Sequence, residues 1–145
     1  MSKRIFTKHL SGTARDESTG WLQQDAIQSW LVQEDIEVIG FQLITQVLIA
    51  DQNDDLAEII GELSQTGLFG QEGLIGQVTG AHLWNSVPAS VDRECPVVTV
   101  MFPEGLAIPV KEEGHIYINA TAKGAAATHT TWLIRATIYY IKRGG

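Results

Sequence analysis

The sequence has little cysteine and little basic charge. Cys95 is its single cysteine, so no intramolecular disulfide can form, and we predict that it is a small, partly buried residue beside Pro96. Lys and Arg total 10 against 17 Asp and Glu, and the formal net charge is −7. Proteins that follow nucleic-acid phosphates usually display a basic patch. The sequence therefore predicts no nucleic-acid partner.

Long hydrophobic runs are also missing. The longest apolar stretch, residues 38–50, is interrupted by Gln42, Thr45 and Gln46. It is also shorter than the roughly 20 apolar residues that a membrane-spanning helix needs. The first residues, MSKR, are not followed by the apolar region of a signal peptide. We therefore expect no membrane contact and no secretion signal.

Motifs for catalysis and metal binding are absent as well. The sequence contains no Gly-x-Ser-x-Gly, no phosphate-binding glycine motif and no His-x-His. His115 lies four residues before Asn119, as in one half of a cupin metal motif, but the other histidines are far away in the sequence. A transition metal needs several ligands that converge on one point. We therefore predict a protein that is not an enzyme, with no catalytic residue, no metal and no cofactor.

The acidic stretch at residues 51–55 could suggest calcium, which binds clustered oxygen atoms. It lacks the spacing, the glycine and the terminal glutamate of an EF-hand loop. We predict a solvated turn there.

The chain is long enough to form one hydrophobic core. It has 145 residues, a mass of 15.9 kDa and 44% hydrophobic residues, within the usual range for one domain. Its 14 glycines favour many tight turns. We predict an N-terminal strand and flexible arm over residues 1–20, and a single β-sandwich domain over residues 21–145.

The C-terminal segment carries the clearest pattern. Its side chains alternate between two faces in a run rich in β-branched and aromatic residues, which predicts a strand. One face holds Trp132, Ile134, Ala136, Ile138 and Tyr140, and the other holds Leu133, Arg135, Thr137, Tyr139 and Ile141. Because both faces contain apolar residues, we expect burial on both sides, with one side available to a subunit interface.

Further strand-like runs recur along the chain at a spacing of roughly ten residues. They cover residues 4–10, 36–50, 57–63, 74–78, 97–102, 106–110 and 115–120. Residues 11–20 and 121–130 are expected to be loops. Residues 21–34 fit a short helix, because Leu22, Ala26 and Trp30 are spaced by four, although part of the run suits a strand. We predict an all-β fold, an antiparallel β-sandwich of jelly-roll type with about seven to nine strands, with one short N-terminal helix left open.

Four segments together resemble small structural proteins of bacteriophages and related viruses. They are EDIEVIGFQL, LAEIIGELSQTG, FPEGLAIPVKEEGHIYINA and TIYYIKR. The resemblance covers roughly residues 34–143. It implies a jelly-roll-like virion subunit: a capsid, decoration or tail-associated protein.

The resemblance implies a non-enzymatic protein that self-assembles through sheet faces and loops. The expected partners are the chain itself, as a homo-oligomer with a trimer preferred, and other virion proteins. The expected location is the virion, after synthesis in the host cytoplasm. From the patterning we select as candidate interface residues Phe102, Tyr117, Trp132, Ile134, Tyr139 and Tyr140.

An alternative function is a carbohydrate- or receptor-binding β-sandwich module. Its platform would be built from tryptophans, because sugar rings stack on indoles. The candidates are Trp21, Trp30, Trp84 and Trp132, which could equally anchor the core or a subunit interface. Exposure of several tryptophans on one surface would favour this alternative.

Overall fold

The computed structural model describes residues 4–16, 20–49, 56–85, 90–93, 96–124 and 131–143. The described residues form ten strands. These are β1 (Phe6–Arg15), β2 (Trp21–Leu31), β3 (Ile36–Ile49), β4 (Leu56–Ser64), β5 (Leu74–Asn85), β6 (Ser90–Arg93), β7 (Val97–Met101), β8 (Ile108–Val110), β9 (His115–Lys123) and β10 (Thr131–Lys142). Three predicted or singled-out positions lie outside the described residues: Cys95, the acidic stretch 51–55 and the loop segment 125–130.

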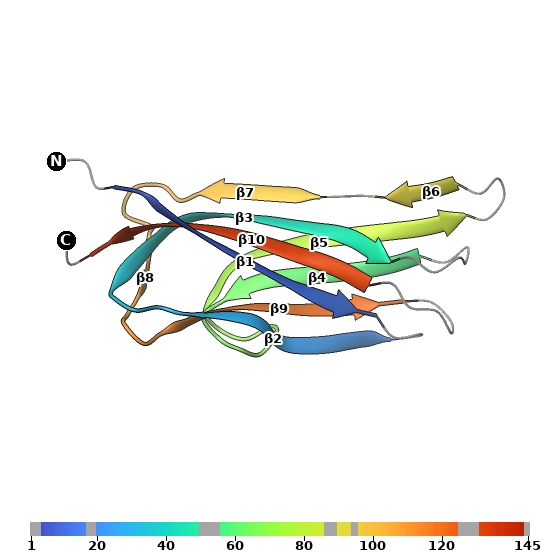
Figure 1. The fold of residues 1–145 in the computed structure, drawn as a ribbon, viewed down its shortest axis with the longest axis horizontal. Helices are drawn as coiled ribbons and strands as arrows, with labels where there is room; N and C mark the ends of the chain where they lie inside the picture. Colours follow the sequence, from blue (N-terminus) through green and yellow to red (C-terminus); the bar gives the residue numbers. More distant parts are fainter. Residues whose placement is uncertain are drawn as a thin grey trace.

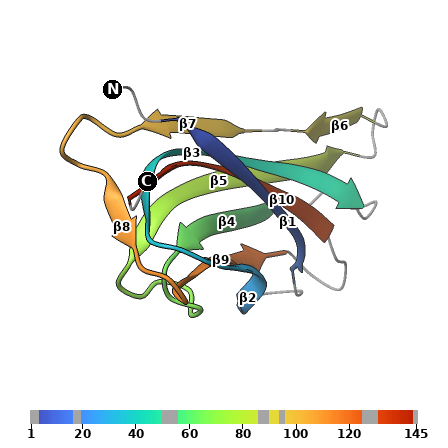
Figure 2. The same cartoon turned by 60° about the vertical axis from the view of Figure 1, so that its left-hand side comes forward.

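The strands form two antiparallel sheets that face each other (Figures 1 and 2). Sheet A has the order β1-β10-β3-β7, with β8 also paired to β3, and sheet B has the order β2-β9-β4-β5-β6. Successive strands alternate between the sheets except at the β4–β5–β6 meander in sheet B and at β7 and β8, which both pair with β3 in sheet A, and the first strand pairs with the last. This is the strand order of a jelly roll, in which two Greek keys wrap around one core. The predicted all-β, antiparallel, jelly-roll-like fold is confirmed.

The core lies between the two inner faces. On β10 the side chains alternate between buried and partly exposed, so the predicted period of two is confirmed. On β3, Val38 before Ile39 and Phe41 after it both face inward and are buried. The alternation changes at this point because a register shift leaves Ile39 as an extra residue opposite β10. The largest fully buried apolar side chains are Trp132, Ile36, Leu43, Ile59, Leu63, Ile116, Ile118, Ile134, Ile138 and Val32.

The short helix suggested for residues 21–34 is wrong, because this segment contains β2 and no helix. In its pairing with β9, the register jumps between Gln24 and Gln28, so residues 25–27 form a bulge opposite Asn119. The inserted residues break the period of two locally, and the spacing of apolar residues then imitates a helical face. The ten strands of the described residues agree with the expected number of about seven to nine.

Two expected loops are shorter in the structure. Residues 11–15, predicted as part of a polar loop, continue β1 and pair with β10 along their whole length. Similarly, β9 extends to Lys123, because its small side chains pack inside the sandwich, where Ala120 and Ala122 are fully buried. The division of the chain into an N-terminal segment and a single domain stays a prediction.

Candidate interaction surfaces

A buried polar cluster supports the outer face of sheet B. The side-chain amide of Asn119 on β9 accepts a hydrogen bond from the backbone N–H of Ala26 (2.7 Å) and donates to the Oε1 atom of Glu62 (3.0 Å) and the backbone oxygen of Thr66 (2.9 Å). The N–H of Gly70 also donates to Oε1 of Glu62 (3.1 Å). We call these five residues the Asn119 cluster. The side chains of Asn119 and Glu62 are essentially unexposed, and the hydrogen bond between them is buried.

The Asn119 cluster joins three segments that are distant in the sequence. It holds the β2 bulge, where Ala26 has a φ of 47°, a left-handed conformation that a residue other than glycine rarely adopts. It also holds the loop 65–73 against sheet B, and the N–H of Phe69 in this loop donates to the Oδ1 atom of Asp25 (2.8 Å). The cluster is therefore a fixing point for a bulge and a loop.

The partial cupin motif does not produce a metal site at this place. The amide of Asn119 is occupied by its three hydrogen bonds, and the ring of His115 stacks on Tyr117 with centroids 5.4 Å apart. Within the described ranges, no group of three or more His, Cys, Asp or Glu side chains is close enough to hold a metal ion. In the same part of the chain, no helix is long and apolar enough to cross a membrane.

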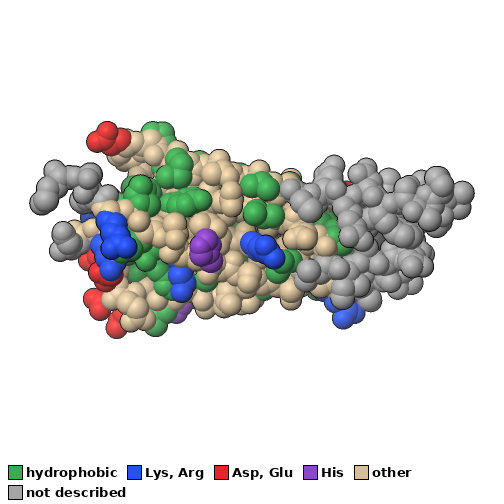
Figure 3. Space-filling model, turned by 45° about the horizontal axis from the view of Figure 1, so that its top comes forward, with side chains coloured by type: hydrophobic (Ala, Val, Ile, Leu, Met, Phe, Trp, Pro, Cys, Tyr) green, Lys and Arg blue, Asp and Glu red, His purple; other side chains and the backbone are tan. Residues whose placement is uncertain are grey.

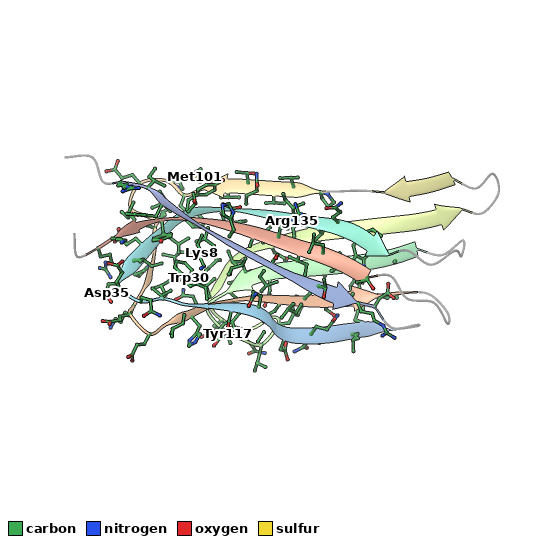
Figure 4. The ribbon with its side chains drawn as sticks, viewed as in Figure 1. Lys8, Trp30, Asp35, Met101, Tyr117 and Arg135 are labelled. Atoms are coloured by element: carbon green, nitrogen blue, oxygen red, sulfur yellow. The ribbon has the colours of Figure 1, made fainter. Side chains whose placement is uncertain are left out.

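An aromatic cluster of Phe6, Trp30 and Tyr140 packs at the seam where β1 of sheet A lies next to β2 of sheet B. Phe6 stacks on Tyr140 with centroids 5.5 Å apart, and Trp30 lies 5.2 Å from the same tyrosine ring. The ammonium group of Lys8 lies 5.7 Å from the Trp30 ring, and Figure 4 shows this pair at the seam. The ammonium group of Lys142 lies 4.6 Å from the Phe6 ring and 2.9 Å from the carboxylate of Glu34. These contacts hold the first strand against the rest of the sandwich.

The predicted interface residues do not form one surface. Trp132 and Ile134 have no exposed area, so both belong to the core and cannot contact a partner from this conformation. Their face of β10 is the inner one, a choice that alternation alone cannot make. Tyr140 lies in the aromatic cluster, and Phe102 is half-buried with its ring 6.0 Å from that of Phe41.

The two remaining predicted residues lie on opposite outer faces. Tyr117 is half-buried on sheet B, where a Cβ on Gly67 would lie 3.3 Å from its ring. Tyr139 is half-buried on the outer face of sheet A, in register with Thr7 and Gly40. Of the selected set, Tyr139 is the residue that best fits a surface contact.

The outer face of sheet A carries very little charge. Arg135 is the one formally charged side chain in the central part of this face, and Arg15 on β1 and Glu37 on β3 lie at opposite ends of the same face. The other residues that the pairing places on this face between β1 and β7 include Thr7, His9, Ser11, Thr13, Leu133, Thr137, Tyr139, Gln42, Ile44, Gln46, Val97, Thr99 and Met101. Among the described side chains in Figure 3, the acidic ones lie mainly at the left-hand end of the view. A hollow of about 510 Å³ lies on this face and includes His9, Gln42 and Arg135 in its lining. Hydroxyl, amide and apolar groups dominate the face.

Sequence reasoning missed the exposed apolar residues of β7. Val97 is 53% exposed and Met101 is 52% exposed, and both point outward from the last strand of the main sheet A order. The alternation in VVTVM was the available signal, because it separates Val97, Thr99 and Met101 from the inward-facing Val98 and Val100.

A second exposed feature is the indole of Trp21 on sheet B. Trp21 is 47% exposed beside a shallow hollow of about 330 Å³ that Glu58, Ile60 and Thr79 also line. By contrast, Trp132 is buried and Trp30 is half-buried in the aromatic cluster. The side chain of Trp84 lies outside the described set. The described tryptophans therefore do not gather on one surface.

No family model matches the chain, and no curated protein sequence matches it. Solved structures with similar folds include viral capsid proteins, the class that the sequence resemblance named. The capsid structure of Helicobacter pylori bacteriophage KHP30 has a TM-score of 0.44 and 10% identity, and the match covers 99% of this chain and 100% of that chain.

The decameric BFDV capsid protein also has a TM-score of 0.44 and 10% identity, with 97% of this chain and 99% of that chain covered. A CocE/NonD family hydrolase from Staphylococcus aureus has a TM-score of 0.38 and 10% identity, with 94% of this chain but 37% of that chain covered. The jelly-roll assignment of the present chain rests on its own strand order.

Proposed function

We propose that this chain is a non-enzymatic structural subunit of a virus particle and associates with copies of itself. Jelly rolls are the scaffold of many capsid proteins and lectin domains, so the fold admits this role without requiring it. The role must therefore be argued from the surface of the molecule.

The observation that carries the proposal is the charge-poor outer face of sheet A. Lys, Arg, Asp and Glu normally make up about a quarter or more of the residues on a protein surface. The cores of protein–protein interfaces are instead depleted of charge and enriched in aromatic side chains and Met. With Arg135 as the single formal charge in its central part and with Tyr139 and Met101 on it, this face has the composition of an interface.

The finer features of the proposal follow from the sequence resemblance. The assembly is a homo-oligomer with a trimer as the preferred building block, and other virion proteins are further partners. The chain is a capsid, decoration or tail-associated subunit, resides in the virion and is made in the host cytoplasm. The Asp and Glu side chains that lie at the left-hand end of Figure 3 face solvent in the assembled particle.

The proposal is tested by the solution mass of the purified chain, measured by size-exclusion chromatography with light scattering, and by electron microscopy of concentrated samples. We expect a stable mass near three times 15.9 kDa, and closed or sheet-like assemblies on the grids. A protein that stays monomeric at high concentration and forms no assembly, alone or with particle proteins of a virus that encodes it, would overturn the proposal.

A carbohydrate-binding module is the second candidate function, and Trp21 is the observation that favours it. A half-exposed indole beside the carboxylate of Glu58 and the hydroxyl of Thr79 offers a stacking surface and hydrogen-bonding groups to a sugar ring. Binding to a glycan array that is lost in Trp21→Ala would establish this function. Absence of glycan binding in the unaltered chain would reject it.

A further inference from the structure

The free edge of β7 is the best-formed docking edge in the described structure. In the ladder with β3, the N–H of Phe102 donates to the oxygen of Ile39 (2.8 Å) and the oxygen of Pro96 accepts from the N–H of Thr45 (3.4 Å). Backbone groups alternate in direction along a strand. The N–H and C=O groups of Val97, Thr99 and Met101 therefore point away from β3, and β7 runs along the margin of the molecule in Figures 1 and 2.

The other edges carry features that hinder the addition of a strand. On β1, the side-chain amide of Gln24 accepts from the N–H of Arg15 (2.9 Å) and donates to its carbonyl oxygen (2.9 Å), so it occupies both edge groups of that residue. The side chain of Ile27 also lies against Gly12 of β1. These contacts from β2 therefore hinder another strand from pairing with the free edge of β1.

The remaining edge strands are short, irregular or charged. β2 contains the bulge at residues 25–27, and β8 has three residues, of which Pro109 has no N–H to donate. β6 has the sequence SVDR, with a charge at each of its last two positions. β7, in contrast, reads VVTVM, with no charge, proline or glycine. Such an edge is a template for pairing with another strand.

We propose that β7 pairs with β7 of a second copy of this chain across a two-fold axis. This joins the two A sheets into one continuous antiparallel sheet. The inference rests on the self-association proposed above and names one of its contacts. In a trimeric building block, this contact would link one trimer to the next.

In this arrangement, the residues of β7 pair well with those of β7 in the second copy. With Thr99 on the axis, Thr99 faces Thr99 of the second copy and Val97 faces Met101 of the second copy. All three are residues whose backbone groups point outward, so the pairing forms about six hydrogen bonds between the copies. On the outer face, the exposed Val97 and Met101 cover each other across the joint, and no two like charges on β7 meet.

The position of Thr99 also favours the pairing. Its hydroxyl accepts a hydrogen bond from the side-chain amide of Gln42 (3.2 Å), so it is held on the outer face next to the axis. The side chain of Met101 lies over Gly40 of β3, where the absence of a side chain leaves room for it (Figure 4). The side chains of Thr99 and Met101 are therefore held in place before a second copy binds.

The test uses the charge of residue 99, because on a two-fold axis this residue meets itself. Thr99→Lys and Thr99→Glu each place like charges opposite one another, so each variant alone should associate at least about tenfold more weakly in analytical ultracentrifugation, about 1.4 kcal/mol. An equimolar mixture of the two variants should recover the association through Lys–Glu pairs. Ser29→Lys is the matched control, because Ser29 is an exposed hydroxyl residue on β2 of sheet B, away from β7 and from the outer face of sheet A. It should associate as the unaltered chain does.

Amide hydrogen exchange of the unaltered chain gives an independent readout. The N–H groups of Val97, Thr99 and Met101 should become more protected as the protein concentration rises, with no change at the exposed N–H groups of other strands. If the chain associates but neither the variants nor these amides respond, the inference is overturned and the proposed function stands on another contact. If the chain shows no two-fold contact in solution yet enters particles, the inference is likewise overturned and the proposed function is kept.

Discussion

Replacement of Asn119 by leucine should destabilise the fold strongly. Leu has the branched shape of Asn and is larger, so Asn119→Leu removes the amide without opening a cavity. Three groups then lose the amide as a partner: the N–H of Ala26, the backbone oxygen of Thr66 and the carboxylate of Glu62, which keeps its bond from the N–H of Gly70. The bulge in β2 and the loop 65–73 lose the side chain that joins them.

The magnitude follows from the burial of these groups. A hydrogen bond between neutral groups contributes about 1 kcal/mol net, and one to a charged group about 1.5–3 kcal/mol, with a further penalty when a buried partner stays unpaired. Two bonds to backbone groups and one to the buried Glu62 together give a loss of about 3–5 kcal/mol. The total stability of a domain is about 5–15 kcal/mol, so a large part of it would be lost.

The assay is urea unfolding followed by tryptophan fluorescence and circular dichroism, with the free energy of unfolding taken from linear extrapolation. Gln46→Leu is the matched control, because Gln46 is exposed on the outer face of sheet A, and it should change stability by no more than about 0.5 kcal/mol. The double variant Glu62→Leu/Asn119→Leu should cost about 1–2 kcal/mol less than the sum of its single variants, because it removes both groups of one buried hydrogen bond together.

A loss below about 1 kcal/mol for Asn119→Leu would refute this reasoning, because it would mean that water or rearranged backbone replaces the amide at little cost. Strict additivity of the Glu62 and Asn119 changes would also refute it, because two groups that share a buried bond must couple.

Three further predictions concern the core and the sheet edges. Thr45→Val should stabilise the fold by about 0.5–1 kcal/mol in urea unfolding, because the buried hydroxyl of Thr45 has no hydrogen-bond partner among the described residues; a destabilised variant would show that the hydroxyl is paired. Gly76→Ala should destabilise it by about 1–3 kcal/mol in the same assay, because a Cβ at residue 76 would collide with the ring of Phe41; an unchanged midpoint would show that the ring moves aside freely. Gln24→Ala should speed amide exchange at Arg15, whose N–H loses its partner, and leave exchange at the centre of β10 unchanged; equal protection at Arg15 in both proteins would reject the role of Gln24.

Much of the fold could be predicted from local patterns. Runs such as VVTVM and the C-terminal segment alternate with a period of two because each strand contacts the core on one face, and this local signal placed most strands correctly. The pattern failed over residues 21–34, where the bulge in β2 depends on Asn119, a residue about ninety positions later in the chain. A local reading cannot detect a partner at that separation.

The candidate surfaces were harder to predict than the strands. Both faces of β10 contain large apolar side chains, so alternation separates the faces but does not tell which one is covered. Trp132 and Ile134 were selected for an interface and are fully buried, whereas Val97 and Met101 were not selected and are exposed. The choice depends on which sheet packs against which, and that is a property of the whole strand order.

The sequence by itself therefore determined the class of the fold, because periodicity, β-branched residues and turn residues act within a few positions of one another. Only the tertiary structure decided which strands pair, since β1 meets β10 across almost the full length of the chain. It also decided that Asn119 joins a bulge and a loop, and that β7 is left with an open edge. These outcomes arise from contacts between distant segments, where register and burial are set by the packing of two complete sheets.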